Sequence, residues 1–324
     1  MTPLALAVAC AADAILGDPI GWPHPVRLIG GACSLCERLA RTYARGDARR
    51  ELVAGTILCA TIVAGTYVVT RSVSAATYKI DRRLGFAFEV GLAWTTLAAR
   101  DLLDEAASVI ASLETGDLAR ARVRVARIVG RDTAHLDAAE LARATIETLA
   151  ESACDGIVAP LLTLAVGGVP LALAFKAAST LDSMIGHMEP PHTFLGRSSA
   201  RLDDLACYVP ARITALLIAS CAPIVDGDRT RALAVLRSDG HRHRSPNAGR
   251  PEAAMAGALG VRLGGANCYD GVLHMAPLLG PSLAAPTAAA AKRAANLVSI
   301  SALVTAAALV TFLAVAQRLH DLPS

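Results

Sequence analysis

The chain has 324 residues, of which 54% are hydrophobic, and its mean hydropathy is +0.46. These values exceed those of an ordinary water-soluble domain and favour an integral membrane protein. The 31 Lys and Arg residues nearly balance the 28 Asp and Glu residues and are scattered along the chain, which excludes the basic footprint of a nucleic-acid-binding protein.

The first predicted element is an apolar segment at residues 4–16, which is short and contains Asp13, so it would span a membrane only with help from neighbouring helices. A polar loop with the sequence GDPIGWPHPVRLIG follows at residues 17–30. Its three prolines fix φ and stiffen the path of the chain. Such stiffness suits a binding loop better than a connector, so we take Asp18, His24 and Arg27 as candidate active-site residues.

Two uncharged segments, at residues 52–70 and 294–317, reach the roughly 20 residues that a helix needs to cross a bilayer. We predict a third span at residues 84–99, which is shorter and contains Glu89. Residues 205–225, interrupted by Pro210 and Arg212, suit an interfacial helix as well as a span. A large soluble protein with buried alanine-rich helices is the alternative interpretation of these segments.

Five arginines precede the first span at residues 52–70 and favour a cytoplasmic position for the segment before it: Arg38, Arg41, Arg45, Arg49 and Arg50.

A broken helix is predicted at residues 157–175, which carry no charge but contain Pro160, Gly167, Gly168 and Pro170. Two half-helices that enter and leave the membrane on one side would account for the break, provided that protein covers the exposed backbone. We therefore favour a re-entrant segment here.

A helix at residues 134–153, capped by Asp132 or Thr133, is expected to carry a stripe of three carboxylates. Glu147, Glu151 and Asp155 are spaced at i, i+4 and i+8, so they fall on nearly one helix face. Arg143 is the only base predicted nearby, so Mg²⁺ or a cationic substrate would offset the repulsion between the carboxylates. A merely solvent-exposed acidic face is the alternative.

Two further polar blocks and a turn-rich loop follow the broken helix, and none of them indicates a particular function by itself. A Walker A motif is absent from the loop, although its glycines could bring backbone N–H groups to an anion. The eight cysteines lack zinc spacing and are expected to be reduced packing residues. The candidate residues in the blocks and the loop are Lys176, Thr180, Asp182, Ser183, Arg201, Asp203, Asp204, Arg212, Ser245, Asn247 and Gly249.

Six sequence blocks follow one another along the chain: GDPIGWPHPVRLIG, VGRDT, ETLAESACDGIVAPLL, STLDSMIGH, ARLDDLACYVPAR and SPNAGRPEAAMAGALGVRLGG. In this order they resemble the blocks of the CobD/CbiB family of cobalamin-biosynthesis membrane proteins, the adenosylcobinamide-phosphate synthases. The resemblance implies one all-α, polytopic integral membrane domain over residues 1–324, in the cytoplasmic membrane, with its active site facing the cytoplasm. Where the family pattern would have asparagine, this chain has Ser152, Ser179 and Cys207.

The resemblance also implies an ATP-dependent amide ligation that joins adenosylcobyric acid, a corrinoid, to aminopropanol or its O-phosphate. Arg27, Arg131, Lys176 and Arg201 would then bind phosphate and carboxylate oxygens, and His24 or Asp182 would accept a proton from the ammonium. We include Asp18 and Asp132 among the catalytic candidates and Thr133 among the substrate-binding ones. Mg²⁺ would be held by some of Glu147, Glu151, Asp155, Asp203 and Asp204.

The partners implied are the two substrates, the lipid bilayer and no nucleic acid, together with a second copy of the chain or other enzymes of the pathway. The competing hypothesis is a membrane transporter or a ligand-sensing protein without ATP turnover, in which the broken helix would form a binding site.

Overall fold

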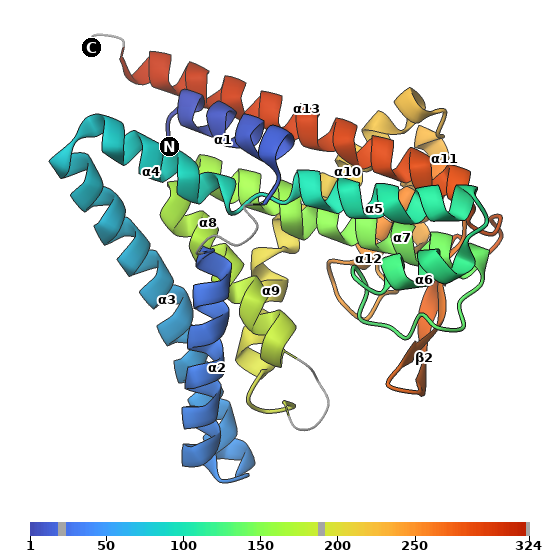
Figure 1. The fold of residues 1–324 in the computed structure, drawn as a ribbon, viewed down its shortest axis with the longest axis horizontal. Helices are drawn as coiled ribbons and strands as arrows, with labels where there is room; N and C mark the ends of the chain where they lie inside the picture. Colours follow the sequence, from blue (N-terminus) through green and yellow to red (C-terminus); the bar gives the residue numbers. More distant parts are fainter. Residues whose placement is uncertain (19–23, 187–191, 322–324) are drawn as a thin grey trace. The chain divides into compact units, whose positions relative to one another are not determined.

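The computed structural model describes residues 1–18, 24–186 and 192–321, and 76% of the chain is helical. The fold is an all-α polytopic membrane protein, as expected (Figure 1). Within the described residues, four helical segments are long and apolar enough to cross a bilayer: Ala48–Ile80, Ala138–Ile185, Arg197–Val225 and Ala288–His320. The predicted spans at residues 52–70 and 294–317 lie inside the first and last of these segments, and residues 205–225 lie inside the third.

The span predicted at residues 84–99 is wrong. Helix α4 (Arg82–Trp94) has 13 residues, so it is about 20 Å long against a hydrocarbon core of about 30 Å. Its last turn ends at Trp94, whose indole Nε1 donates to the Gly17 carbonyl at 2.8 Å. This hydrogen bond joins the end of α4 to the end of the first helix. The sequence pattern had predicted that the apolar helix continues beyond Trp94 to residue 99. That first helix, α1 (Pro3–Leu16), is the short apolar helix predicted at residues 4–16.

We expected a single domain, and the chain divides into two compact units, each built from segments that are distant in sequence. Unit 1 comprises residues 1–98, 159–207 and 306–324, and unit 2 comprises residues 99–158 and 208–305. Helix α13 (Ala288–His320) contributes its first part to unit 2 and its last part to unit 1. Besides α1 and α4, the helices of unit 1 are α2 (Pro25–Ala44), α3 (Ala48–Ile80), α8 (Ala159–Ile185) and α9 (Arg197–Ala206).

Within unit 1, α3 packs against α2, α4, α8 and α9, and α2 and α3 lie side by side (Figure 1). The core between them is apolar and includes Cys33, Leu58, Leu181 and Leu195. Close packing requires a glycine on α3, because a Cβ built at Gly55 would lie 1.9 Å from the Leu195 carbonyl oxygen. All eight cysteines of the chain are free, and five of them are buried, in agreement with the packing role predicted for them.

The predicted break in the helix at residues 157–175 is present. Gly168, inside α8, has φ of 66° and ψ of −165°, and Pro170 follows within the same helix. A positive φ is open to glycine at little cost, whereas proline removes a backbone N–H donor, so the two residues together kink the helix. Re-entry of the two halves on one side of the membrane stays a prediction.

Unit 2 is helical apart from one hairpin. Its helices and turns are α5 (Ala99–Glu114), α6 (Leu118–Val125), α7 (Ala138–Ser152), a π-helical turn (Ala153–Val158), α10 (Tyr208–Cys221), a 3₁₀ turn (Ala222–Val225), α11 (Arg229–Asp239) and α12 (Gly249–Leu259). The helix predicted at residues 134–153 begins later than expected, because Asp137 caps it. The Asp137 carboxylate accepts from the Glu140 N–H at 2.8 Å, and the Glu140 carboxylate accepts from the Asp137 N–H at 3.0 Å.

The hairpin consists of antiparallel strands β1 (Leu263–Tyr269) and β2 (Val272–Leu279) and was not predicted. Its turn residues are Asp270, with φ of 49°, and Gly271, with φ of 78°. Positive φ at both central positions is the requirement of a type I′ turn, for which Asp-Gly is a preferred pair. The Asp-Gly dipeptide between two apolar runs was thus the sequence signal for this hairpin.

Candidate active site

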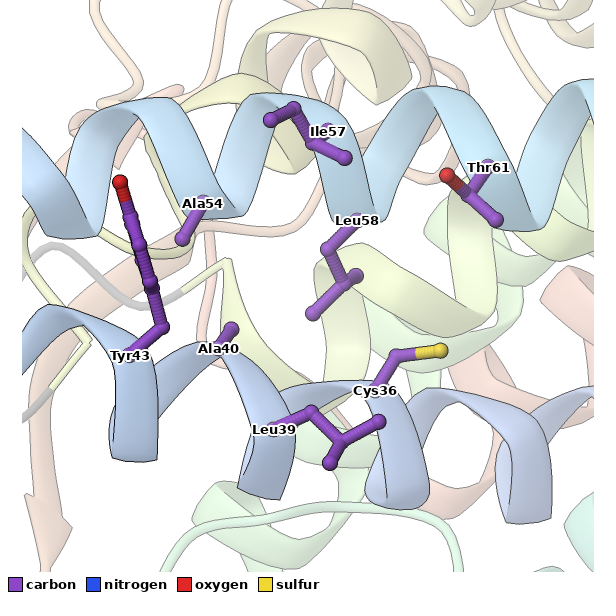
Figure 2. Close-up of a pocket in the computed structure, with 8 residues that line it drawn as sticks. All are labelled: Cys36, Leu39, Ala40, Tyr43, Ala54, Ile57, Leu58 and Thr61. Atoms are coloured by element: carbon purple, nitrogen blue, oxygen red, sulfur yellow. The ribbon is translucent and has the colours of Figure 1, made fainter.

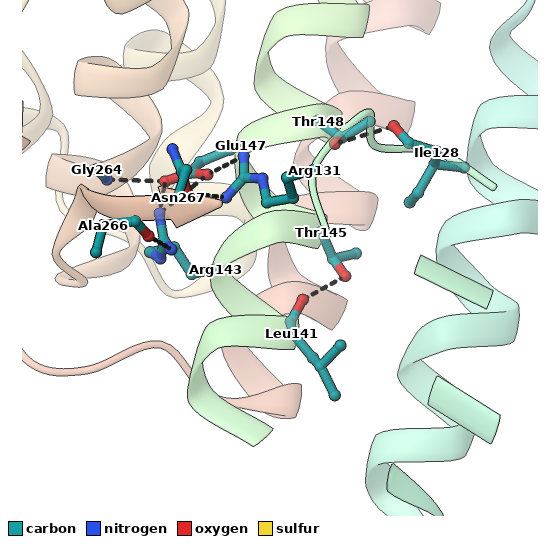
Figure 3. A network of polar contacts seen from close by, with 10 residues as sticks. All are labelled: Ile128, Arg131, Leu141, Arg143, Thr145, Glu147, Thr148, Gly264, Ala266 and Asn267. Atoms are coloured by element: carbon teal, nitrogen blue, oxygen red, sulfur yellow. Dashed lines mark hydrogen bonds and ion pairs between the residues drawn. The ribbon is translucent and has the colours of Figure 1, made fainter. Parts of the chain in front are cut away.

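A buried ionic network centred on Glu147 lies in unit 2 (Figure 3). One carboxylate oxygen, Oε2, accepts from Arg131 Nη2 at 2.7 Å, and the other, Oε1, accepts from Arg143 Nη1 at 3.1 Å. The Gly264 N–H also donates to Oε1 at 2.8 Å. The side chains of Arg131, Arg143 and Glu147 are 11%, 9% and 7% exposed. Two guanidinium groups are therefore held nearly out of water by one carboxylate.

The same two guanidinium groups bind the hairpin. Arg131 Nη1 donates to Asn267 Oδ1 at 2.7 Å, and Arg143 Nη2 donates to the Ala266 carbonyl at 2.8 Å. Arg131 comes from the segment after α6, Arg143 and Glu147 from consecutive turns of α7, and Asn267 from β1. The rigid arginine forks thus fix three separate segments to one another.

The carboxylate stripe is only partly as predicted. Arg131 joins Arg143 beside Glu147, so the expectation that Arg143 is the only nearby base is wrong. Glu151 is exposed, and Asp155 lies in the π-helical turn, where α-helical spacing no longer sets its direction. Among the described residues, no group of three or more His, Cys, Asp or Glu side chains could hold a metal ion. Binding of Mg²⁺ by one or two of these carboxylates together with substrate phosphates stays a prediction.

Glu252 of α12 is a second buried acid in this part of unit 2, and the sequence analysis missed it. The residue is 7% exposed. Burial raises the pKa of its carboxyl group well above the usual value, and the negative charges of Glu147 and Glu151 raise it further, while Arg131 and Arg143 act in the opposite direction. The Glu252 carboxyl group therefore keeps its proton to higher pH than an exposed glutamate does. A lone carboxyl in the apolar sequence PEAAMAGAL was the signal that could have found it.

The loop before α12 holds the predicted residues Ser245, Asn247 and Gly249 beside His243. His243 Nδ1 accepts from the Ser245 N–H at 3.0 Å, and the Ser245 hydroxyl accepts from the Asn247 N–H at 3.3 Å. A Cβ at Gly249 would lie 2.4 Å from His243 Cβ, so only glycine allows this approach. Burial lowers the pKa of His243, which keeps the imidazole neutral at pH 7. The turn is thus ordered by its own polar side chains.

Arg212 of α10 reaches the same loop. Its guanidinium stacks over the Tyr208 ring at 3.3 Å from the centroid and donates to the Tyr208 carbonyl at 2.6 Å. A longer contact of 3.5 Å joins it to Asn247 Oδ1. Stacking and hydrogen bonding together fix the plane of the guanidinium, as recognition of a phosphate or carboxylate requires.

Asp132 and Thr133 do not cap a helix. The Asp132 carboxylate accepts from the Gly271 N–H at 2.9 Å, and its own N–H donates to the Cys268 carbonyl at 2.8 Å. These bonds hold the hairpin turn, and the hydrogen bond from Gly271 is the main cause that lowers the pKa of Asp132. The Thr133 hydroxyl donates to the Arg122 carbonyl at 3.1 Å. Both residues therefore have structural contacts that differ from the predicted cap.

In unit 1, the side chains of Asp18 and His24 lie next to each other. His24 Nε2 lies 2.9 Å from Asp18 Oδ1, and His24 Nδ1 accepts from the Val26 N–H at 3.3 Å, which caps α2. His24 is 8% exposed, whereas Arg27 is exposed in the first turn of α2. The predicted stiffening by Pro19 and Pro23 lies outside the described residues.

The remaining candidates of unit 1 lie on α8 and α9. The Thr180 hydroxyl donates to the Lys176 carbonyl at 2.7 Å, and the Ser183 hydroxyl donates to the Ser179 carbonyl at 2.9 Å. Arg201, Asp203 and Asp204 follow on α9, with Arg201 exposed. Consecutive residues on an α-helix point about 100° apart, so Asp203 and Asp204 would not easily reach one ion together, and their role in metal binding stays a prediction. Convergence of the candidates of units 1 and 2 on one site stays a prediction.

Comparisons with known proteins agree over most of the chain. A family model described as CobD/Cbib protein matches residues 6–298. Cobalamin biosynthesis protein CobD of Klebsiella pneumoniae is 42% identical over 283 residues, which is 87% of this chain and 88% of the relative. Protein CbiB of Salmonella typhimurium is 42% identical over 280 residues, or 86% and 88% of the two chains. Protein CobD of Pelobacter propionicus is 43% identical over 281 residues, or 87% and 86%. No solved structure matches.

Proposed function

Because the chain belongs to the CobD/CbiB family and has a role in cobalamin biosynthesis, we propose that it is an adenosylcobinamide-phosphate synthase. The reaction joins a free carboxyl group of adenosylcobyric acid to the amine of aminopropanol or its O-phosphate. ATP is consumed, and the product is adenosylcobinamide or its phosphate. The proposal also places the active site on the cytoplasmic side, where ATP is available.

The observation that supports ligation is the pair of buried guanidinium groups held by Glu147. A carboxylate is a poor acyl donor, so we propose that its oxygen attacks the γ-phosphorus of ATP, with release of ADP and formation of an acyl phosphate. The amine then attacks the acyl carbon, and inorganic phosphate leaves from the tetrahedral intermediate. Phosphate and carboxylate oxygens are the groups that planar arginine forks bind best.

In this mechanism Glu147 is a positioning residue. Its two oxygens hold Arg131 and Arg143 in fixed planes, at 2.7 and 3.1 Å, so little reorganisation is needed when an anion binds. The guanidinium of Arg212, stacked on Tyr208, is a further anion-binding candidate in unit 2. From unit 1 we assign Arg27, Lys176 and Arg201 to substrate anions.

A proton must leave the substrate ammonium before the amine can attack. We assign its removal to the His24 and Asp18 pair, whose side chains are 2.9 Å apart, with Asp182 as the second candidate. Mg²⁺ would enter with the phosphates of ATP, and we derive no step through a metal held by the protein.

The test uses protein purified in detergent and supplied with cobyric acid, Mg²⁺, ATP and either aminopropanol or its O-phosphate. We expect the amide product by mass spectrometry, with one ADP formed per amide. The variant Glu147→Gln should lose product, whereas Glu114→Gln, an exposed acid paired with Lys292, should keep it. Substrate binding without any amide or ADP would contradict the proposal and favour a transporter or a ligand sensor.

A further inference from the structure

An apolar groove lies between α2 and α3 in unit 1, and none of the candidate catalytic residues lines it (Figure 2). Its volume is about 330 Å³. The residues that line it carry no charge and comprise Cys36, Leu39, Ala40, Tyr43, Ala54, Ile57, Leu58 and Thr61. Leu39, Tyr43 and Ile57 are 62%, 63% and 61% exposed, so the groove opens outward from the two helices.

The depth of the groove matches one leaflet of a bilayer. Arg50 and Glu51 precede the uncharged part of α3, which begins at Leu52, and Thr61 lies eleven residues beyond Arg50 along the helix. At 1.5 Å per residue the groove thus reaches about 16 Å beyond Arg50, which is close to half of the roughly 30 Å hydrocarbon core. A chain that fills the groove would start at the membrane surface and end near the midplane.

Positive charge gathers at the end of the groove nearest the connection between α2 and α3. Within the described part of the chain, no ion pair is formed by the exposed side chains of Arg45, Arg49 and Arg50. Among the acids nearby, Glu37 pairs with Arg41 at 2.8 Å, and the Asp47 carboxylate accepts from the Arg50 N–H at 2.8 Å. Glu51 follows Arg50, so the three arginines still outnumber Asp47 and Glu51 at this end of the groove. These three guanidinium groups are therefore available to an anion at the membrane surface.

We propose that the groove binds one acyl chain of an anionic phospholipid, whose headgroup phosphate contacts Arg45, Arg49 and Arg50. The chain lies against Leu39 and Ile57, with its end near Thr61. Charge complementarity selects an anionic headgroup over a zwitterionic one, and the apolar lining accommodates the chain. The site is independent of the proposed ligase reaction.

Native mass spectrometry of the detergent-purified full chain, titrated with phosphatidylglycerol or phosphatidylcholine, tests the headgroup. We expect phosphatidylglycerol to bind more tightly and the triple variant R45Q/R49Q/R50Q to weaken its binding roughly tenfold or more, since each arginine near an anionic surface contributes on the order of a fivefold gain. The triple variant R71Q/R82Q/R83Q, which removes three exposed charges near and beyond the other end of α3, is the matched control and should bind as the parent does. Equal binding of both lipids would overturn the proposal.

A second measurement tests the groove itself. Ile57→Trp narrows the groove, and we expect it to weaken phosphatidylglycerol binding, whereas Val68→Trp at an equally exposed position of α3 should not. Loss of binding in R45Q/R49Q/R50Q with unchanged binding in Ile57→Trp would show headgroup attraction without chain insertion, and would refute the groove as the site. Because neither measurement uses ATP or a corrinoid, failure of this proposal is distinguishable from failure of the ligase assignment.

Discussion

Arg131 and Glu147, sixteen residues apart in sequence, form a 2.7 Å ion pair in which neither side chain is more than 11% exposed. Burial makes the pair costly to separate, because each charge would remain out of water without its partner. Arg143 shares the same carboxylate, so the stability of this part of unit 2 and the geometry proposed for catalysis depend on one side chain.

Glu147→Gln keeps the shape of this side chain and removes its charge. Two buried guanidinium groups would then lack a counter-charge, and we expect unfolding to require about 3–5 kcal/mol less free energy. Denaturant unfolding in detergent measures the change. The control Glu114→Gln breaks an exposed pair with Lys292 and should cost no more than about 1 kcal/mol. Similar losses in both variants would contradict the importance of the buried network.

Glu252→Gln should change the pH dependence of stability. The folded chain keeps the proton of Glu252 above pH 4.5, the usual value for glutamate, whereas the unfolded chain releases it there. From pH 4.5 up to the raised pKa of the folded state, the wild-type free energy of unfolding should therefore fall by about 1.4 kcal/mol per pH unit relative to the variant. Thermal unfolding of both proteins between pH 5 and 8 checks this. Parallel curves would show that Glu252 is ionised in the fold.

Arg27→Ala tests the loop before α2. If Arg27 binds a substrate anion, its removal should cost about 1.5–3 kcal/mol in transition-state stabilisation, measured as amide product per unit of inserted protein. Arg27→Lys should recover only part of the activity, because an ammonium lacks the bidentate fork. Expression and membrane insertion are expected to remain normal, since the side chain is exposed. Full activity of both variants would remove Arg27 from the active site.

Gly55→Ala should destabilise unit 1. The added methyl group would meet the Leu195 carbonyl oxygen at 1.9 Å, and backbone atoms cannot move aside cheaply. We expect a loss of about 1–3 kcal/mol, as in other overpacked cores. Gly65→Ala on the same helix meets nothing within 4 Å and should be neutral or gain up to about 1 kcal/mol from helix propensity. Equal melting temperatures of the two variants would argue against this close approach.

Local sequence patterns predicted the elements whose cause is itself local. The spans inside α3 and α13 follow from uncharged apolar runs, and the kink at Gly168 follows from glycine and proline within one helix. The sequence failed where a distant residue decides the outcome. Nothing in the sequence near Glu147 shows that Arg131 will supply a second positive charge. Asp132 was predicted as a helix cap, but its carboxylate accepts from the Gly271 N–H in the hairpin turn.

In the candidate site, too, the sequence predicted local features and missed those that depend on distant residues. Residue types and block order indicated which polar residues to examine, and several of them, such as Ser245 and Asn247, do contact each other. Glu252 was missed because a carboxyl within an apolar helix gives no periodic signal. Its role depends on the charges of Glu147 and Glu151, which only the folded chain brings within range.

The division of α13 between the two units has a consequence for biogenesis. All buried residues of α13 lie in the part that belongs to unit 2, from Ala290 to Thr305, so unit 2 is not complete until the ribosome has made this part of the helix. The earlier helices of unit 2 must therefore enter the bilayer before this part of α13 can pack against them. A stop codon before residue 288 would leave unit 2 unfinished, and membrane quality-control proteases should remove such a product.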